Sequence, residues 1–421
     1  MQLSGLLSFQ KQRRPLAIAA ACVLLMQAGA GWETIAAQQA DVASVERSDK
    51  RATRRPDHFL PSRPENIAWG WFPLDNPSVL TIQSGETVRI NTLTGSGATG
   101  TATPVEFFAP FGVQPAEILP DVFDFWQARA GAGGPPPEPR TGRSGHLLTG
   151  PIYIANAEPG DMLEIQILDI DTRVPYGINN TSPNGGVFGL NYPGRRPEDP
   201  NPALPDIPDA GTLPGVRQHL YRTTKIRGKD VALFSESIHV PLGPFMGVMG
   251  VAPLDPVVGQ PGVTVPGVQA SGPPGNFGGN MDLKQLTAGT TLYLPVFRRG
   301  GQFYTGDPHS AQGDGEVSGT AIEHSLTGVF RFVLHKGKTI EWPRAENDDF
   351  YIMMGIDLDL NRAMRIATME VVKFLVEEKG LTQAKALSLA SIAVDFRVAE
   401  VVDGTQVITG NIPKSLFLKK P

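Results

Sequence analysis

The sequence predicts a mainly β protein, α+β overall, with β-sandwich or barrel-like lobes and two helices near the C-terminus. Glycine (47) and proline (38) are both abundant among the 421 residues, and such frequent turn residues favour short strands over long helices. Several segments also alternate apolar and polar residues, which is typical of half-buried strands. Hydrophobic residues make up 41% of the chain, so it can bury a large core, and its length suggests two or three lobes.

The N-terminus has the pattern of a secretory signal peptide. A basic region with arginines at 13–14 precedes an apolar run over 15–26 and then small residues, and the run is too short for a transmembrane helix. We expect 1–37 to be a signal peptide and 38–57 a flexible polar leader. The mature protein is then periplasmic or secreted, by either a general secretory or a twin-arginine route.

Charge and cysteine content narrow the functional classes. The net charge is −5, and loss of the signal peptide removes three basic residues and one acidic residue, leaving about −7. An acidic exported protein is a poor candidate for binding nucleic acid or, after signal cleavage, an anionic membrane. The single cysteine, Cys22, lies in the expected signal peptide, so the mature chain has neither a disulfide nor a thiol.

Ordered structure is expected to begin at His58, in an N-terminal β-rich lobe over 58–275. Its first two strands are predicted near 78–82 and 87–90, joined by a Ser-Gly-Glu turn at 84–86. Proline- and glycine-rich inserts interrupt this lobe. Segments of this kind are often lids or walls of sites in compact enzymes, and the two main inserts cover 107–140 and 177–215.

Three further segments have strand patterns. Apolar and polar residues alternate over 163–170. Over 328–334, Val329, Arg331 and Val333 alternate with larger apolar residues, and 290–297 is rich in β-branched and aromatic residues. His239 also lies in a β-like run, and we interpret it as a packed strand residue and not as a ligand.

The second lobe, 276–421, ends in the two predicted helices. Apolar residues recur every three or four positions over 360–374 and form one apolar face. Gly380 is placed to end this helix, and Thr382 to cap a shorter second helix. Both are interpreted as core helices without a chemical role.

The polar residues best suited to chemistry are concentrated in the segment 280–323. Four of its acids and a histidine lie close to glycines, and glycine allows tight bends that bring side chains of one segment to one point. Carboxylate and imidazole groups suit divalent cations, although the spacing matches no simple zinc motif such as HExxH. A glycine-rich hairpin loop without chemistry is the alternative. The residues are Asp282, Asp307, His309, Asp314 and Glu316.

Two stretches of this region, GGNMDLKQLTAGTTLYLPVF (278–297) and GDPHSAQGDGEVSGTAIE (306–323), resemble the core of the acetamidase/formamidase family. That family hydrolyses short-chain amides to carboxylate and ammonia. The resemblance extends from His58 to the end of the chain. It implies a β-rich, two-lobed fold, a homo-oligomer and a small amide as substrate.

Shorter segments carry the same resemblance. The bacterial branch of the family has a histidine similar to His58 that is followed by a Trp-Gly-aromatic run, as here at 69–71. The other similar segments are GHLLTGPI (145–152), PFMGVMGVAP (244–253) and the closing VVDG (401–404).

An amidase without cysteine needs either a hydroxyl nucleophile, for which no base is obvious, or a metal-activated water. We expect a divalent metal, zinc in the first place, with calcium or magnesium as alternatives. The expected metal ligands are His58, His146, Asp307 and His309; the expected catalytic residues are Glu316, as general acid/base, and Asp282, which could instead be a further ligand; the expected substrate-binding residues are Gly279, Asn280 and Gln312.

Two functional hypotheses follow. The first is an exported amidohydrolase that cleaves the C–N bond of short-chain amides. The second is an exported, non-enzymatic protein that binds a metal or a small polar ligand on the same scaffold. The sequence favours the enzyme, because GDPHSAQGDGE keeps every polar residue of the motif, whereas a binding protein needs only part of that set.

Export predicts that the mature protein begins near residue 38. Expression in a secreting host, followed by N-terminal sequencing of the exported fraction, measures this directly. An intact Met1 on the soluble protein contradicts the prediction. As a control, iodoacetamide leaves the activity of the exported protein unchanged, because its expected mature chain has no thiol.

Overall fold

The computed structural model describes residues 55–74, 77–130, 145–182, 185–189, 217–254 and 268–418. The expected signal peptide, nearly all of the expected leader, residues 131–140 of the first insert and most of the second insert lie outside these ranges. Within them, no helix is long and apolar enough to cross a membrane.

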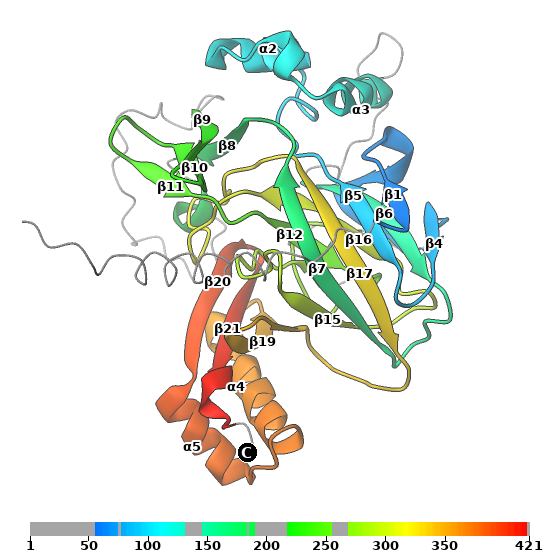
Figure 1. Ribbon diagram of the computed structural model, residues 1–421, viewed down its shortest axis with the longest axis vertical. Helices are drawn as coiled ribbons and strands as arrows, with labels where there is room; N and C mark the ends of the chain where they lie inside the picture. The colour runs from blue at the N-terminus through cyan, green and yellow to red at the C-terminus, as the bar shows by residue number, and fades with distance from the viewer. Residues whose placement is uncertain are drawn as a thin grey trace, which may run out of the picture. The chain divides into compact units, whose positions relative to one another are not determined.

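A nine-stranded sheet is the largest element (Figure 1). Its neighbouring strands are antiparallel except for the first pair. In order across the sheet they are β1 (His58–Leu60), β5 (Thr87–Asn91), β17 (Leu326–His335), β7 (Met162–Thr172), β15 (Thr291–Pro295), β18 (Arg344–Glu346), β19 (Phe350–Asp357), β21 (Thr405–Pro413) and β20 (Asp395–Asp403).

A six-stranded sheet packs against the middle of the first, which makes a β-sandwich. Apolar side chains of both sheets share one core; for example, the buried rings of Phe303 and Phe332 meet edge to face with their centroids 5.1 Å apart. The second sheet has the order β14 (Gly278–Asn280), β12 (Phe245–Gly250), β16 (Phe303–His309), β6 (Leu147–Ile154) and β2 (Ile67–Trp69), and β4 (Leu80–Ile82) also pairs with β6.

The structure confirms the predicted fold class, mainly β with two C-terminal helices. The predicted strands over 163–170, 290–297 and 328–334 are β7, β15 and β17 of the large sheet. The two strands predicted near 78–82 and 87–90 also form, but they do not pair with each other. Because β4 pairs with β6 and β5 pairs with β1 and β17, the turn between them crosses from one sheet to the other.

Two smaller sheets and two short helices complete the N-terminal part. The helices lie partly within the predicted insert over 107–140 and pack through aromatic contacts such as Trp69 with Phe125. His239 is in a strand, as predicted, but its side chain is exposed. The elements are β8 (Tyr176–Thr181), β9 (Arg217–Ile226), β10 (Lys229–Leu233) and β11 (His239–Pro241) in one sheet, β3 (Trp71–Pro73) and β13 (Val268–Ala270) in another, and the helices α2 (Pro104–Phe108) and α3 (Pro120–Ala130).

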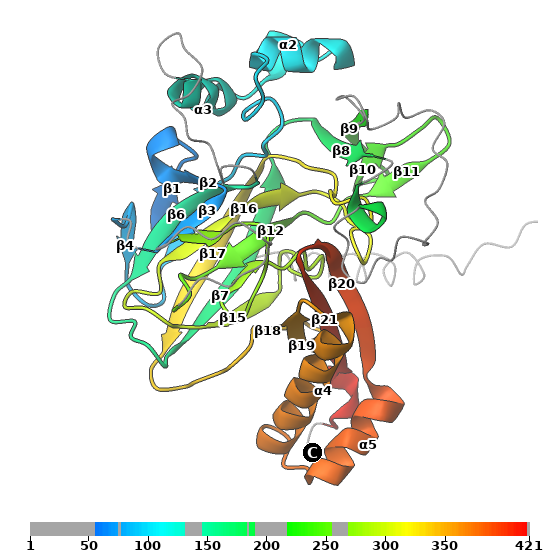
Figure 2. The ribbon, with the colours of Figure 1, turned by 180° about the vertical axis from the view of Figure 1, so that it is seen from behind.

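The two C-terminal helices, α4 (Leu360–Glu377) and α5 (Gln383–Ala393), follow the sequence prediction closely. Thr382 caps α5 by accepting a hydrogen bond from the backbone of Lys385. Helix α4 lies over β19 and β21 (Figure 2). A glycine allows this close approach, because a Cβ at Gly355 would lie 2.1 Å from the carbonyl oxygen of Ala363.

Strands from both sides of residue 275 share both large sheets. In the large sheet β15 pairs with β7, and in the smaller one β16 pairs with β12 and β6. No sheet boundary therefore coincides with the predicted division between 58–275 and 276–421. The consequence for function is that a site at the end of β16 can draw side chains from distant parts of the chain.

The packing of α4 gives a testable prediction. Gly355→Ala forces α4 away from β19 and is expected to lower the free energy of unfolding by about 1–3 kcal/mol, the usual cost of overpacking. Urea unfolding followed by circular dichroism measures it. Gly100→Ala is the matched control, since a Cβ there meets no atom within 4 Å. Equal stability of the two variants contradicts this account of the contact.

Candidate active site

The centre of the site is the last part of β16, which carries Asp307 and His309. Residues two apart on a strand lie on the same face, and the Nε2 atom of His309 is 3.1 Å from Asp307 Oδ2. The chain then loops away and returns at Glu323, whose Oε1 is 3.2 Å from the same Nε2 atom. Glu316, within the loop, places its Oε1 at 3.9 Å. Three carboxylates therefore surround one imidazole nitrogen.

The backbone is strained where it delivers these acids. Asp282, Asp307 and Glu316 have φ angles of +42°, +50° and +46°, a left-handed conformation that costs an L-residue about 1–2 kcal/mol. Gly247 on β12 leaves room for two of them, because a Cβ there would lie 2.4 Å from Asp282 Oδ1 and 2.7 Å from Asp307 Oδ2. Strain of this kind is concentrated at functional sites.

Gln312 sets the orientation of the His309 ring. The Nε2 amide of Gln312 donates a hydrogen bond to the carbonyl oxygen of Asp282 at 2.7 Å, so its Oε1 accepts one from Nδ1–H of His309 at 3.0 Å. The other ring nitrogen, Nε2, then faces the carboxylates and has no hydrogen-bond partner. A second residue that holds one imidazole nitrogen while the other faces a cluster of acids is typical of metal-ligating histidines.

The buried acids differ in their pKa values. Burial raises the pKa of Asp282 well above the ordinary range, and the charge of Glu316 raises it further. Burial also raises the pKa of Glu316, and there the charge of Asp403 adds to the effect. Burial also opposes ionisation of Asp307, but the imidazoles of His146 and His309 outweigh it and lower its pKa. Neighbouring carboxyl groups with divided pKa values are typical of acid/base sites.

The pKa of His309 is raised well above its ordinary value. Burial opposes a charge on the ring, but Asp307 and Glu323 outweigh that effect. The site therefore stabilises positive charge next to Nε2, in the form of either a proton or a cation.

The C-terminal hairpin closes the site from another direction. Asp403, at the end of β20, accepts a hydrogen bond from Nδ2 of Asn280 at 2.8 Å. Glu400 accepts hydrogen bonds from the backbone of Val402 and Asp403, and its own backbone forms a bridge with Gly315 next to Glu316. Strand β20 thus both contributes an acid and braces the glycine turn.

The structure brings most of the predicted site residues together. His146, just before β6, lies with Nε2 3.8 Å from Asp307 Oδ2, while its Nδ1 faces the carbonyl oxygen of Ser271. Gln312 contacts His309 and Asp282 and does not line the cavity that opens over the cluster, which is described below. The predicted residues that lie in or against the cluster are Asp282, Asp307, His309, Glu316, His146, Asn280 and Gln312.

Two predicted residues take other positions. His58 lies on β1, at the edge of the large sheet, where its Nε2 is 2.9 Å from Glu86 Oε2. It neither lines the cavity nor belongs to a group of possible metal ligands. Gly279 precedes Asn280 in a left-handed conformation and also does not line the cavity. Asp314, a further acid of the segment, pairs with Lys284 at 3.0 Å.

Three acids of the site were missed by the sequence prediction: Glu323, Glu400 and Asp403. The only signals for the first and last are the ends of the motifs GDPHSAQGDGEVSGTAIE and VVDG, which contain Glu323 and Asp403. Nothing in the local sequence distinguishes Glu400 from a solvated strand residue.

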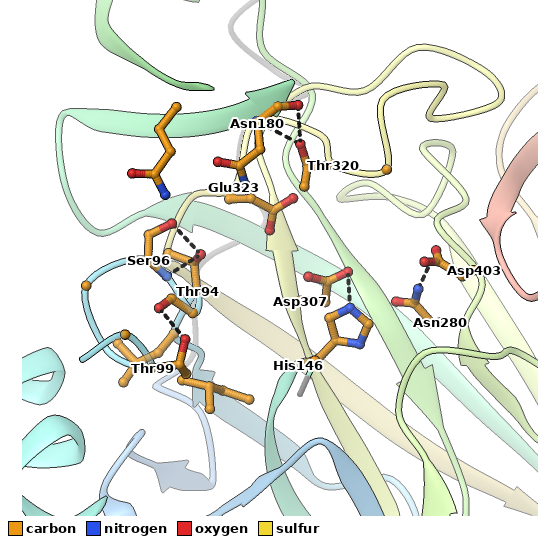
Figure 3. A pocket seen from close by; sticks show the side chains of 18 of the residues that line it. Thr94, Ser96, Thr99, His146, Asn180, Asn280, Asp307, Thr320, Glu323 and Asp403 are labelled. Atoms are coloured by element: carbon orange, nitrogen blue, oxygen red, sulfur yellow. Dashed lines mark hydrogen bonds and ion pairs between the residues drawn. The ribbon is translucent and has the colours of Figure 1, made fainter. Parts of the chain in front are cut away.

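A cavity of about 330 Å³ opens over the cluster (Figure 3). The acids, histidine and asparagine that line it are His146, Asn280, Asp307, Glu316, Glu323 and Asp403. Asn280 and Asp403 lie at one end, whereas Glu323 lies beside Asn180 and Thr320 toward the other (Figure 3). The neutral residues that line it are Leu93, Thr94, Gly95, Ser96, Gly97, Thr99, Gly100, Phe107, Asn180, Gln218 and Thr320.

The donor atoms fit a metal ion. Two groups, Asp282–His309–Glu316 and Asp307–His309–Glu323, each offer three ligand atoms within 4.8 Å of one another. Both carboxylate oxygens of Asp282 and Nε2 of His309 are buried without a hydrogen-bond partner. Burying such atoms unpaired is unfavourable, and a cation bound among them removes that cost.

The cluster is an acid-rich group of possible metal ligands on a β-sandwich, and sequence comparison identifies the family. The acetamidase/formamidase family model matches residues 141–260 and 263–419. The chain belongs to this family.

Individual relatives agree with that assignment. A putative formamidase of Schizosaccharomyces pombe is 32% identical over 205 residues, and the formamidase of Methylophilus methylotrophus is 29% identical over 202. Each alignment covers 41% of this chain and 47% of the relative, so the chain spans about half the length of the curated relatives it matches. The crystal structure of an acetamidase from Bacillus halodurans superposes with a TM-score of 0.63 at 25% identity, over 85% of this chain and 98% of that one.

Two of the three histidines that the sequence assigned to metal now give opposite predictions. His309→Ala removes the nitrogen around which the carboxylates gather, so we expect its zinc affinity to fall at least about 100-fold, more than the loss of a residue that only orients a ligand would cause. His58→Ala is the matched control and is expected to bind zinc normally. Metal analysis and calorimetric titration of both variants measure this. Loss of zinc in His58→Ala alone contradicts the geometry described above.

Proposed function

We propose that the protein is an exported, metal-dependent amidase that hydrolyses the C–N bond of amides to a carboxylate and ammonia. The observation that carries the proposal is the convergence of Asp307, Glu316 and Glu323 on Nε2 of His309, at one end of a cavity. Family membership supports amide hydrolysis, and the names of the relatives, formamidase and acetamidase, point to short-chain amides.

Asp307, His309 and Glu323 are the residues that would hold the metal. Zinc is favoured over calcium or magnesium, because an imidazole nitrogen is a poor ligand for hard oxygen-seeking cations. When bound, zinc polarises a carbonyl group and lowers the pKa of a bound water to about 7. His146 lies beside Asp307 and is a candidate for a further ligand.

Asn280 is suited to orient the substrate. Its Nδ2 is committed to Asp403, so its Oδ1 is an acceptor, and this atom is buried without a hydrogen-bond partner. Asn280 lines the cavity. Its Oδ1 accepts a hydrogen bond from the N–H of the substrate amide and turns the carbonyl group toward the acids.

Glu316 is the proposed general acid/base. It lines the cavity, and burial raises its pKa well above the ordinary range, which favours a group that takes up a proton during the reaction and then releases it. It takes a proton from the water that adds to the carbonyl carbon and passes it to the departing nitrogen, so that the C–N bond breaks and the nitrogen leaves as ammonia. Asp282, more deeply buried than Glu316, is proposed to hold the His309 ring from behind, where its Oδ1 lies 3.6 Å from Nδ1.

The alternative is a non-enzymatic protein that binds a metal or small ligand on the same scaffold. A binding site has no need of an acid with a raised pKa beside an ionised one, which is why the enzyme is favoured. A homo-oligomer, implied by the family resemblance, stays a prediction.

Glu316→Gln tests the proposed role. Glutamine keeps the shape of the side chain but cannot carry the proton, so kcat for ammonia release from acetamide is expected to fall by about 10²–10⁴-fold. Metal content is expected to stay the same and KM to change little, because the lost interaction is made mainly in the transition state.

Asp314→Asn is the matched control, since Asp314 lies in the same loop but pairs with Lys284; its kcat should match that of the wild type. If Glu316→Gln keeps most of its activity, or loses its metal, the role proposed for Glu316 is wrong. If the wild type with added zinc releases no ammonia from any amide, the binding protein becomes the better hypothesis.

A further inference from the structure

The cavity is larger than the substrates in the relatives' names require. It measures about 330 Å³, and since a water molecule occupies about 30 Å³ in the liquid, this is roughly ten waters. Formamide and acetamide have only three and four non-hydrogen atoms. Either would fill the end near Glu316 and leave the rest of the cavity to solvent.

The far end of the cavity has its own polar wall on β8 and β9. Asn180 and Gln218 are direct cross-strand partners there, and both line the cavity. The backbone N–H of Asn180 donates to Thr320 Oγ1 at 2.9 Å, and its carbonyl oxygen accepts from the same hydroxyl at 3.3 Å. These bonds position the residue without using its side chain.

The side chain of Asn180 has an unused acceptor. Its Oδ1 atom is buried and has no hydrogen-bond partner, a state that costs about 1–3 kcal/mol. A hydrogen-bond donor on a bound molecule would remove this cost. Figure 3 shows Asn180 beside Thr320 and Glu323, well separated from Asn280 and Asp403, so the two unpaired asparagine oxygens serve different parts of a ligand.

The opposite wall is neutral and rich in hydroxyl groups. Thr94, Ser96 and Thr99 come from the glycine-rich segment before α2, and Phe107 of α2 lies beside them. Thr94 and Ser96 form hydrogen bonds with each other. The Thr99 hydroxyl donates a hydrogen bond to the carbonyl oxygen of Gly95 at 3.0 Å. The walls thus offer hydrogen-bonding groups and one aromatic ring, that of Phe107.

Charge restricts what can bind. Four carboxyl groups line the cavity, from Asp307, Glu316, Glu323 and Asp403, and no lysine or arginine is among the described residues that line it. An anionic acyl group would meet repulsion without a compensating cation on the protein.

We propose that the far end is an acyl-side subsite and that the substrate is an amide larger than acetamide, with a neutral hydrogen-bond donor on its acyl part. A hydroxyl or a second carboxamide has this chemistry. The donor pairs with Asn180 Oδ1, while the reacting amide lies at Asn280 and Glu316. This inference rests on the proposed amidase function and specifies its substrate class.

Steady-state kinetics of the zinc-loaded full chain test the subsite. Butyramide is compared with its 2-, 3- and 4-hydroxy derivatives, and succinamide with the nearly isosteric anion succinamate. The best hydroxybutyramide is expected to exceed butyramide in kcat/KM by at least about tenfold, and succinamide to exceed succinamate similarly, the scale of one hydrogen bond to a buried acceptor.

Two variants locate the effect. Asn180→Leu and Gln218→Met keep the side-chain volume but remove the amide, and each is expected to lower the ratio of kcat/KM between hydroxybutyramide and butyramide by at least about fivefold. Gln83→Met is the matched control, because Gln83 is exposed in the turn after β4; it should keep the wild-type ratio. Melting temperatures confirm that each variant is folded.

The outcomes separate this inference from the function on which it rests. If acetamide is hydrolysed but the hydroxylated and plain amides are equally good substrates, the subsite is refuted and the amidase stands. If both subsite variants keep the wild-type ratio, the assignment to Asn180 and Gln218 is wrong. If no amide is hydrolysed with zinc, calcium or magnesium, the function and the subsite both fail.

Discussion

The attraction between His309 and the acids around it is the interaction on which the rest of the site depends. Buried carboxylates repel one another, and burial alone favours their neutral forms. Positive charge on the imidazoles of His146 and His309 offsets both effects at Asp307 and lowers its pKa, while burial raises the pKa of Glu316. The strained backbone at the three acids and the glycine at 247 are consequences of gathering these groups at one point.

The sandwich provides the rigidity that such a cluster needs. All seven residues of β16 are buried, with β12 on one side and β6 on the other. A site at the end of a packed strand is held more precisely than one on a loop. The hairpin β20–β21 then adds Asp403 and supports the turn at Glu316, so the C-terminal part is a component of the site as well as a separate layer with its own helices.

Elements that depend on local sequence patterns were predicted correctly, whereas pairings between distant segments were not. Strands β7, β15 and β17 and helices α4 and α5 were predicted because their apolar periodicities are local properties of the chain. The pairing of β4 and β5 was not, since a short turn suggests a hairpin but the two strands find different partners in different sheets. Helices α2 and α3 were hidden in a proline-rich region, where proline at the first turn starts a helix instead of breaking one.

The sequence by itself determined the central part of the site. Asp307 and His309 share a strand face, and the surrounding glycines permit the bends that bring in Glu316, so local rules were enough. Only the tertiary structure decided that Asp403, 123 residues from its partner Asn280, joins the cluster and that His58 pairs with Glu86 instead. The physical reason is that strand pairing across sheets sets such distances, and side chains far apart in sequence carry no local signal of which ones will meet.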